Sequence, residues 1–352
     1  MTKIGVLGAG TWGMALARML CNSGHAVMVW SALEREVEEF SATRRHPNLP
    51  GMVIPDGIVF TKEISEVCCD KEILLFAVPS PFVRATARNA APYITDGQII
   101  VDVAKGIEAD TLLTMTGIIA DELKNPNVKL VALSGPTHAE EVAKDLPTTI
   151  VSACADMAAA ERVQQVFGNT CMRVYTNEDV LGVELCGAMK NIIALASGAA
   201  LGLGYGDNTK AALITRGMTE IARLGIAMGC VPQTFYGLAG VGDLIVTATS
   251  VHSRNNRCGL LIGQGVAPTE AVKQVGMVVE GINALPAAMR LAKKYGVEMP
   301  IVAAVDAVVK GEMAAADAVE RLMRREQKQE QLEENERCIY DRKRCAERDI
   351  WI

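Results

Sequence analysis

Short apolar runs alternate with amphipathic stretches through the first half of the chain. The apolar runs occupy residues 3–7, 26–30, 73–78, 99–103, 129–133 and 149–153. Several of them are apolar at every position, which is the pattern of parallel strands buried on both faces of a sheet. Helical periodicity fills the intervals, most clearly at residues 11–23, 81–91 and 157–167. This order predicts a doubly wound α/β domain.

The pattern changes after Asn177. The segment that follows, to about residue 325, is rich in Ala, Leu, Ile, Met and Gly, with helical periodicity and few strand signals. Asn177 is a candidate N-cap for the first of these helices, with Glu178 and Asp179 in its first turn. The apolar run 191–206 holds four glycines and is shorter than the roughly 20 residues that a membrane span needs, so it predicts a buried helix.

We therefore divide the chain into an N-terminal α/β domain at residues 1–185, an all-α domain at 186–325 and a charged extension at 326–352. The extension mixes acidic and basic residues with few apolar ones, which indicates a solvated helix or a disordered tail. A partner-binding tail is the alternative. The apolar helices of the second domain could form only core or also the interface of a homodimer, and the sequence leaves the oligomeric state open.

Composition narrows the classes of function. The net charge is −6 and both signs are mixed along most of the chain, so no surface is built to neutralise the phosphates of a nucleic acid. The 10 cysteines form no C-x-x-C pair, which favours free thiols in a reducing cytosol over a zinc site or disulfide framework. The N-terminus enters a strand pattern at once, without the order of a signal peptide. We expect a cytoplasmic protein that neither spans a membrane nor binds a metal.

A glycine-rich turn carries the clearest motif. Gly8, Gly10 and Gly13 form G-x-G-x-x-G directly after the first apolar run and at the start of a helical stretch. In this context Gly8 permits the tight turn, Gly10 lets a pyrophosphate approach the backbone, and Gly13 lets helix and strand pack closely. The helix N-terminus then offers N–H donors to the anion. The motif predicts a Rossmann domain that binds NAD(H) or NADP(H).

The residues after the second apolar run should select between these two cofactors. An acid there would bind the ribose hydroxyls, whereas an arginine would favour the 2′-phosphate. The chain reads WSALER from Trp30, with no acid directly at the strand end. Ser31 could contact either cofactor, while Glu34 and Arg35 could equally lie on the helix surface. The cofactor preference stays open.

Notable residues follow three later strands, at the edge where open α/β sheets bind ligands. The first of these strand ends reads VPSP at 78–81 and carries Ser80. Lys105 supplies a cation, Gly135 a backbone N–H and Thr137 a hydroxyl. Solvated turns are the alternative for each of them.

A lysine in the second half is a candidate acid or base. Lys190 lies in an apolar helical segment near the predicted domain junction, where desolvation would lower its pKa. Oxidation of an alcohol by hydride transfer needs such a group to take the hydroxyl proton. A snorkelling or ion-paired lysine is the alternative. Asp243 could orient this lysine or a substrate hydroxyl, and Arg254 could bind a phosphate, although both could lie in surface loops.

Taken together, these segments resemble NAD(P)-dependent glycerol-3-phosphate dehydrogenase of the soluble bacterial type. The matching motifs run in the family's order over about residues 3 to 325. They are GAGTWG at 8–13, VAKG at 103–106, SGPT at 134–137, GAMKN at 187–191, ALITRG at 212–217, GVGDL at 240–244, SRN at 253–255, VVEG at 278–281 and GVEMPI at 296–301.

The resemblance implies reversible reduction of dihydroxyacetone phosphate to sn-glycerol 3-phosphate, which supplies glycerophospholipid synthesis, with Lys190 as general acid/base. It also implies a set of substrate-binding residues, namely Lys105, Gly135, Thr137, Lys190, Asp243, Ser253, Arg254 and Asn255. The cofactor residues that it implies, with the glycines of the turn, are Gly8, Gly10, Thr11, Trp12, Gly13, Ser31, Lys105, Ala139, Arg254, Val278 and Glu280.

Two positions depart from the family pattern. His138 stands where an aromatic residue, usually Phe, is expected, and the segment 30–33 lacks the basic residue that is often present. Two other classes of function remain as alternatives: a Rossmann dehydrogenase for hydroxy acids or sugar acids, and a non-catalytic dinucleotide sensor.

Overall fold

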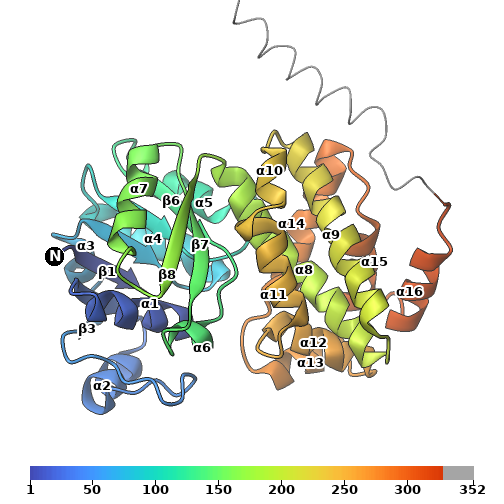
Figure 1. Ribbon diagram of the computed structural model, residues 1–352, viewed down its shortest axis with the longest axis horizontal. Coiled ribbons are helices and arrows are strands. Elements are labelled where there is room, and N and C mark those ends of the chain that lie inside the picture. Colours follow the sequence, from blue (N-terminus) through green and yellow to red (C-terminus); the bar gives the residue numbers. More distant parts are fainter. Residues whose placement is uncertain (328–352) are drawn as a thin grey trace, which may run out of the picture.

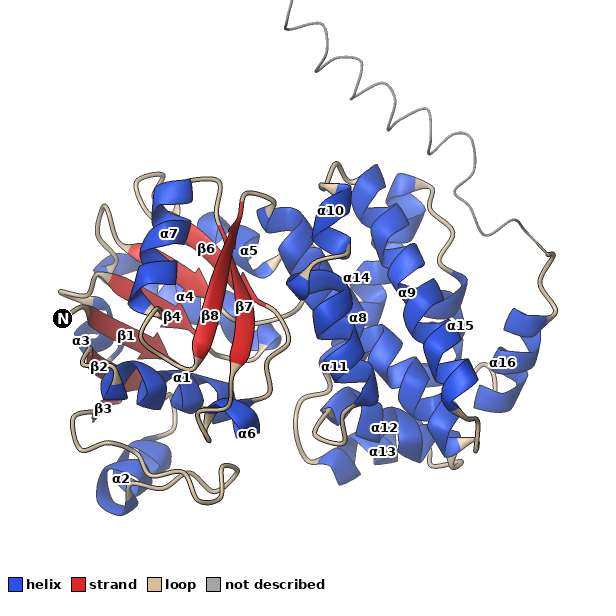
Figure 2. Cartoon of the chain, in the orientation of Figure 1, coloured by secondary structure: helices blue, strands red, loops and turns tan. Residues whose placement is uncertain are grey.

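The computed structural model describes residues 1–327 and has two halves. One half holds the sheet with its flanking helices, and the other is built of helices packed on one another (Figure 1). Strands are confined to the first half (Figure 2). The predicted fold class, a Rossmann-type α/β domain followed by an all-α domain, is confirmed. The predicted extension lies, from residue 328 on, outside the described residues.

The sheet has eight strands in the order β3-β2-β1-β4-β5-β6-β7-β8. Their bounds are β1 Lys3–Leu7, β2 Ala26–Trp30, β3 Val59–Thr61, β4 Ile73–Phe76, β5 Ile99–Asp102, β6 Lys129–Ser134, β7 Thr148–Ala153 and β8 Met172–Asn177. All neighbours are parallel except β6 and β7, which pair antiparallel. The strand order reverses between β1 and β4, so the crevice at their carboxyl ends is where such a sheet binds ligands.

Sequence patterning missed β3 and β8, the two edge strands. β3 is only three residues long, and β8 alternates buried and exposed positions instead of forming an apolar run. Both differences follow from edge position, because an edge strand need not be buried on both faces.

Alternate side chains of the central strands enter two separate cores. Ile73 and Leu75 of β4 pack in the core that includes α1 and α7, whereas Leu74 and Phe76 pack in the core that includes α4 and α5. The sheet-flanking helices are α1 Thr11–Asn22, α2 Glu34–Thr43, α3 Ile64–Cys68, η1 Ser80–Phe82, α4 Val83–Ala90, η2 Ala91–Tyr93, α5 Met115–Leu123, α6 Ala139–Val142 and α7 Met157–Val166. This double burial explains the continuous apolar runs of the sequence.

The helical half is organised around α8. Its elements are α8 Val180–Gly202, α9 Asp207–Ala227, α10 Pro232–Phe235, η3 Leu238–Gly242, α11 Asp243–Thr249, α12 Arg254–Gly263, α13 Pro268–Val275, α14 Glu280–Tyr295, α15 Pro300–Val309 and α16 Ala315–Met323. Within the described residues, α8 is long and apolar enough to cross a membrane, as is the bent pair 232–249 and 254–263 if counted as one span. However, 83% of the apolar window of α8 is buried in the protein, as expected for a core helix.

Glycines let α8 and α12 pack backbone against backbone. A Cβ on Gly198 would lie 2.0 Å from the carbonyl oxygen of Asn256, and one on Gly259 would lie 2.0 Å from that of Leu195. No real side chain tolerates such distances. The close approach fixes the N-terminal end of α12 relative to α8.

The start of α8 differs from the prediction in its cap. Asp179, not Asn177, is the N-cap, and its carboxylate accepts the backbone N–H of Gly182 at 2.9 Å. Asn177 is the last residue of β8, and its side chain accepts the N–H of Asp179 at 2.8 Å. The helix therefore begins two residues later than the pattern suggested. The division at residues 185 and 186 falls within α8 and stays a proposal.

A buried carboxylate ties α8 to the sheet half. Glu184 accepts the hydroxyls of Thr114 and Thr116 at 2.7 and 2.5 Å and the N–H of Thr116 at 2.8 Å. These are the cap and first turn of α5, so the carboxylate satisfies N–H and O–H donors at a helix N-terminus. Burial raises the pKa of Glu184. These hydrogen bonds hold the two halves together near the carboxyl edge of the sheet.

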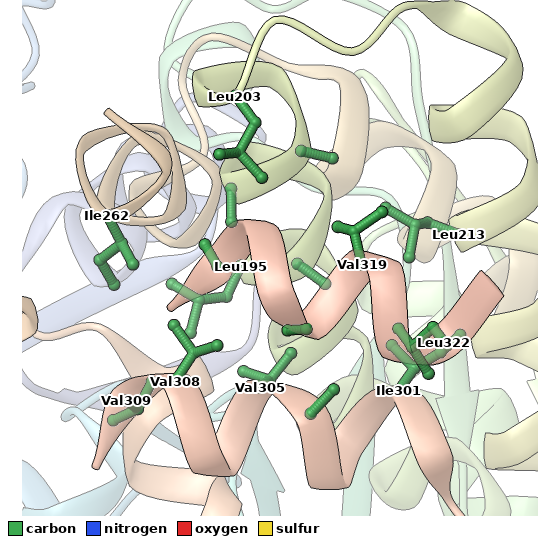
Figure 3. Close-up of a pocket in the computed structure, with 16 residues that line it drawn as sticks. Leu195, Leu203, Leu213, Ile262, Ile301, Val305, Val308, Val309, Val319 and Leu322 are labelled. Carbon is green, nitrogen blue, oxygen red and sulfur yellow. The ribbon is translucent and has the colours of Figure 1, made fainter. Parts of the chain in front are cut away.

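An apolar pocket of about 60 Å³ lies in the helical half, between α8, α15 and α16 (Figure 3). Leu, Ile, Val and Ala line it, including Leu195, Val305 and Leu322. With no polar group to orient a substrate, it offers no chemistry, and the candidate site lies instead where the two halves meet.

Candidate active site

The glycine-rich turn has the geometry that its motif predicts. Gly8 has a φ of +121°, and a Cβ there would lie 2.8 Å from the backbone of Ala77. A Cβ on Gly13 would lie 2.3 Å from the carbonyl oxygen of Gly8, so α1 packs closely on the turn. A Cβ on Gly10, by contrast, would meet nothing within 4 Å. The turn is therefore tight against the sheet and open on its outer side.

The open side of this turn suits an anion. Gly10 is the N-cap of α1 and provides no side-chain acceptor, so the first N–H groups of the helix have no side-chain cap among the described residues. No acidic residue lies in the first turn of α1, which begins with Thr11 and Trp12. Free N–H donors and the positive end of a helix are what a pyrophosphate needs. The arrangement fits a dinucleotide.

His46 supports the glycine-rich turn through a hydrogen bond to its backbone. Its Nε2 lies 3.2 Å from the carbonyl oxygen of Ala9, and its Nδ1 accepts the N–H of Asn48 at 3.2 Å. Because Nδ1 accepts, Nε2 carries the proton and donates to Ala9. Burial lowers the pKa of His46. Sequence reasoning did not single out this histidine, and no local motif marks it.

Where the loop after β5 meets the helical half, two lysines converge on one carboxylate. Lys190 of α8 donates to Oδ1 of Asp243 at 2.5 Å, and Lys105, from the loop after β5, donates to Oδ2 at 2.7 Å. Asp243 is wholly buried and Lys190 is 5% exposed. The pair that the sequence proposed separately is thus joined by the aspartate, across the boundary between the two halves.

Asp243 owes its position to the start of α11. The π-helical turn η3 leads into α11, and Asp243 is the first residue of the latter. A carboxylate is stabilised at a helix N-terminus. One turn later Thr247 lies on the same face, and its hydroxyl accepts a hydrogen bond from Lys190 at 2.5 Å. The sequence analysis missed Thr247, although its i, i+4 spacing from Asp243 could have indicated it.

Burial governs the protonation of Lys190. Desolvation lowers its pKa to about 7, against the opposing attraction of Asp243 and with a further lowering by the charge of Lys105. An ammonium with this pKa can both give and take a proton near neutral pH. Lys190 does form the ion pair that the sequence analysis gave as the alternative to a catalytic role. The same surroundings bring its pKa into the range that acid–base chemistry needs.

The loops after β5 and β6 meet beside these lysines. Lys105 donates to the carbonyl of Gly135 at 3.1 Å and lies 3.4 Å from the hydroxyl of Thr137. The hydroxyl of Ser134 is buried without a hydrogen-bond partner, next to Gly187 and the Lys105 stem. These contacts bring together the strand-end residues that the sequence proposed.

A chain of amides links α8, α12 and α14. Asn255 donates to the side-chain oxygen of Asn191 at 2.9 Å and accepts the N–H of Gly281 at 2.9 Å. Glu280, the residue before Gly281, accepts hydrogen bonds from the N–H and the hydroxyl of Ser80, after β4, at 3.1 and 2.6 Å. The side chain of Asn255 is thus engaged within the protein, and the N-terminus of α14 lies at the sheet edge beside Ser80. Ser80 lies in one of the strand ends that the sequence analysis noted, without a role assigned to it, whereas Asn191 was not selected.

Arg254 is the first residue of α12, capped by Ser253, whose hydroxyl accepts the N–H of Asn256 at 3.2 Å. Within residues 1–327, Arg254 has no ion pair or hydrogen bond from its guanidinium. The cation that the sequence assigned to a phosphate is available for one.

His138, in the loop between β6 and α6, contacts the helical half of the protein. Its ring lies 5.9 Å from that of His252, and the carbonyl of Val246 on α11 acts on it as an acceptor. Burial, followed by the charge of Lys190, lowers the pKa of His138, so the ring is neutral at neutral pH. Its Nε2 is buried without a hydrogen-bond partner.

The remaining predicted cofactor residues lie at element ends. Ser31 follows β2, Ala139 is the first residue of α6, and Val278 precedes α14. Their roles stay predictions. Among residues 1–327, no group of His, Cys, Asp and Glu has the arrangement of a metal site.

Comparison with known proteins agrees with this geometry. The family model described as NAD-dependent glycerol-3-phosphate dehydrogenase N-terminus matches residues 3–160, and the corresponding C-terminus model matches residues 179–320. The chain belongs to the NAD-dependent glycerol-3-phosphate dehydrogenase family. The predicted resemblance and enzyme class, an NAD(P)-dependent oxidoreductase, are confirmed.

Members of the glycerol-3-phosphate dehydrogenase family match over nearly their whole length. The glycerol-3-phosphate dehydrogenase [NAD(P)+] 2 of Lactobacillus delbrueckii subsp. bulgaricus is 70% identical over 94% of this chain and 99% of its own. The glycerol-3-phosphate dehydrogenase [NAD(P)+] of Agathobacter rectalis is 51% identical over 93% and 97%. The crystal structure of the Coxiella burnetii enzyme superposes with a TM-score of 0.88 at 35% identity, covering 92% of this chain and 99% of that one.

Proposed function

We propose that the protein reversibly reduces dihydroxyacetone phosphate to sn-glycerol 3-phosphate with NAD(P)H, and that Lys190 is the general acid/base. The observation that carries the proposal is the convergence of Lys190 and Lys105 on the buried Asp243, beside a glycine turn that fits a dinucleotide. The names of the relatives agree with this reaction.

Bound NAD(P)H supplies the hydride that reduces the carbonyl carbon. As the carbonyl oxygen gains negative charge, the ammonium of Lys190 donates a proton to it, and in the reverse direction neutral Lys190 takes the hydroxyl proton. The buried Asp243 holds the amine in place and stabilises its charged form. Thr247 supplies the amine with a second fixed partner, so that its orientation is set before the substrate arrives.

The substrate phosphate needs cations that the chain does not neutralise. Arg254 has no internal partner among residues 1–327 and can bind a phosphate through two parallel hydrogen bonds. Asn255 fixes the start of α12 through Asn191 and Gly281, which positions Arg254. Lys105 holds the loops of Gly135 and Thr137 and adds positive charge near the carbonyl.

The cofactor residues would act from the opposite side of the crevice. The N–H groups at the start of α1 would hold the pyrophosphate at Gly10, Thr11 and Trp12. Glu280, bound to Ser80, would fix the N-terminus of α14 close to the strand ends. We further propose a cytoplasmic enzyme that supplies glycerophospholipid synthesis, with no nucleic-acid partner.

Purified protein tests the reaction directly. We expect loss of NADH or NADPH absorbance on addition of dihydroxyacetone phosphate, and formation of sn-glycerol 3-phosphate in equal amount. Pyruvate and a 2-keto sugar acid serve as substrates for the alternative dehydrogenase class. Faster turnover of either keto acid than of the triose phosphate would contradict the proposal, as would dinucleotide binding without turnover of any of these compounds.

A further inference from the structure

No acidic residue directly follows β2 in the sequence, but the fold brings a carboxylate to the end of this strand. Ser31 follows β2 directly, and its hydroxyl donates to Oε2 of Glu36 at 2.6 Å while accepting the N–H of Leu33 at 3.1 Å. This turn folds α2 back against the strand end, near β3 (Figure 1). Glu36 is therefore adjacent to β2 in space although it is five residues beyond Ser31.

The charge of Glu36 also acts on a residue that supports the glycine-rich turn. This residue is the buried His46, which donates to the carbonyl of Ala9 within the glycine-rich turn. The carboxylate of Glu36 is thus held at the residue that directly follows β2, the strand after the glycine-rich turn. In a Rossmann domain, this is the place of the adenosine ribose.

We propose that Glu36, held in place by Ser31, binds the 2′-hydroxyl of the adenosine ribose, so that the enzyme uses NAD(H) in preference to NADP(H). The inference rests on the proposed dehydrogenase function and specifies its cofactor. A carboxylate accepts a hydrogen bond from a ribose hydroxyl but repels a 2′-phosphate, which carries about −1.5 to −2 charges.

The surrounding charges favour the same cofactor. Lys62, which follows β3, forms an ion pair with Glu34. This lysine is thereby compensated and offers little attraction to a further phosphate. Arg35 is the residue that could instead favour NADP(H), since it is exposed on the first turn of α2 and close in sequence to Ser31.

Binding of the adenosine half separates these alternatives without any turnover. Calorimetric titration of the full-length apoprotein with ADP-ribose and with 2′-phospho-ADP-ribose should give at least a roughly tenfold tighter complex with ADP-ribose, the order expected from one charge-assisted hydrogen bond. Steady-state kinetics with NADH and NADPH on dihydroxyacetone phosphate should give the same preference in kcat/KM. Equal or tighter binding of 2′-phospho-ADP-ribose overturns the proposal.

Two variants and a matched control locate the selectivity. Glu36→Gln should lower the ADP-ribose preference about tenfold or more, through weaker binding of ADP-ribose and stronger binding of 2′-phospho-ADP-ribose. Ser31→Ala should move the ratio in the same direction, because Glu36 loses the hydroxyl that fixes it. Glu38→Gln removes the same charge from an exposed position of α2 and should leave the ratio unchanged.

Other outcomes count against the proposal. An unchanged ratio in Glu36→Gln, or an equal change in Glu38→Gln, would overturn it, since the selectivity would then be absent or a general effect of charge. Selective loss of 2′-phospho-ADP-ribose binding in Arg35→Ala, from a wild type that prefers that ligand, would assign the site to Arg35. A protein that binds ADP-ribose with the expected preference but reduces no triose phosphate would contradict the proposed reaction and leave this inference intact.

Discussion

The ammonium nitrogen of Lys190 lies 2.5 Å from Oδ1 of Asp243, and almost no part of either side chain is open to water. The two residues come from α8 and α11, and are separated by 53 positions in the chain. Because the other oxygen of Asp243 binds Lys105 of the sheet half, this carboxylate connects the acid–base group to the loops at the sheet edge.

Replacement of Lys190 by alanine should lower kcat by roughly 10²- to 10⁴-fold, the usual contribution of a general acid or base. Binding of NADH, followed by its fluorescence, should be retained, because the glycine turn does not contact Lys190. Lys210→Ala, which removes a half-buried lysine paired with the exposed Asp207, is the control and should keep wild-type turnover. Wild-type turnover in Lys190→Ala would refute the assigned role.

Asp243→Asn should affect both stability and proton transfer. Removing one partner of a buried ion pair leaves an uncompensated charge and costs about 3–5 kcal/mol. The loss of the carboxylate also removes the main factor that raises the pKa of Lys190, so the pKa should fall further. Denaturant unfolding measures the first effect and the pH profile of kcat measures the second. A profile that keeps its wild-type midpoint would show that Asp243 does not govern Lys190.

The two directions of the reaction should respond oppositely to pH. Reduction needs the ammonium form of Lys190, so its kcat should fall as pH rises through about 7, whereas oxidation should rise over the same range. Stability follows a different window. Because the folded pKa of about 7 lies below the ordinary 10.5, the unfolded chain binds more protons between these values. Lys190 therefore makes stability rise with pH across that window, and the full penalty persists below it.

In Lys190→Met the pH-dependent part of this penalty should disappear. The measurement is the free energy of unfolding of wild type and variant at several pH values from neutral to alkaline. Equal slopes in the two proteins would contradict the lowered pKa of the folded state.

Two glycines of the turn should respond differently to substitution. Gly10→Val should leave stability nearly unchanged, since its Cβ meets nothing within 4 Å, but should raise the Kd for NADH by filling the space of the pyrophosphate. Gly13→Ala should destabilise the fold by about 1–3 kcal/mol, because its Cβ would overlap the carbonyl of Gly8. Thermal unfolding and NADH titration distinguish the two effects. Tight NADH binding by a folded Gly10→Val protein would place the pyrophosphate elsewhere.

Gly198→Ala should act on the substrate site through helix packing. Its Cβ would lie 2.0 Å from the carbonyl of Asn256, so α12 must move away from α8 at a cost of about 1–3 kcal/mol. The shift would displace Arg254 and raise KM for the triose phosphate more than KM for NADH. Gly206→Ala, at an open position without a positive φ, is the control. A change in stability with an unaltered KM for the triose phosphate would show that Arg254 does not depend on this packing.

The sequence by itself determined the α/β half, the helical half, the glycine turn and the family. Continuous apolar runs reveal strands such as β4 because both faces of that strand are buried, and the turn is recognisable because it needs glycines at fixed spacing. These are local requirements, so local patterns record them. The edge strand β8 and the cap at Asp179 were missed because each has weak local preferences and is decided by its neighbours.

Only the tertiary structure decided which side chains meet. Nothing in the spacing of Lys105, Lys190 and Asp243 says that one carboxylate holds both amines, because the contact depends on how α8 and α11 pack against the sheet edge. The lowered pKa of Lys190 depends on the same packing, since it arises from the exclusion of water. Glu36 likewise reaches the end of β2 through the return of α2, which no strand-end motif describes.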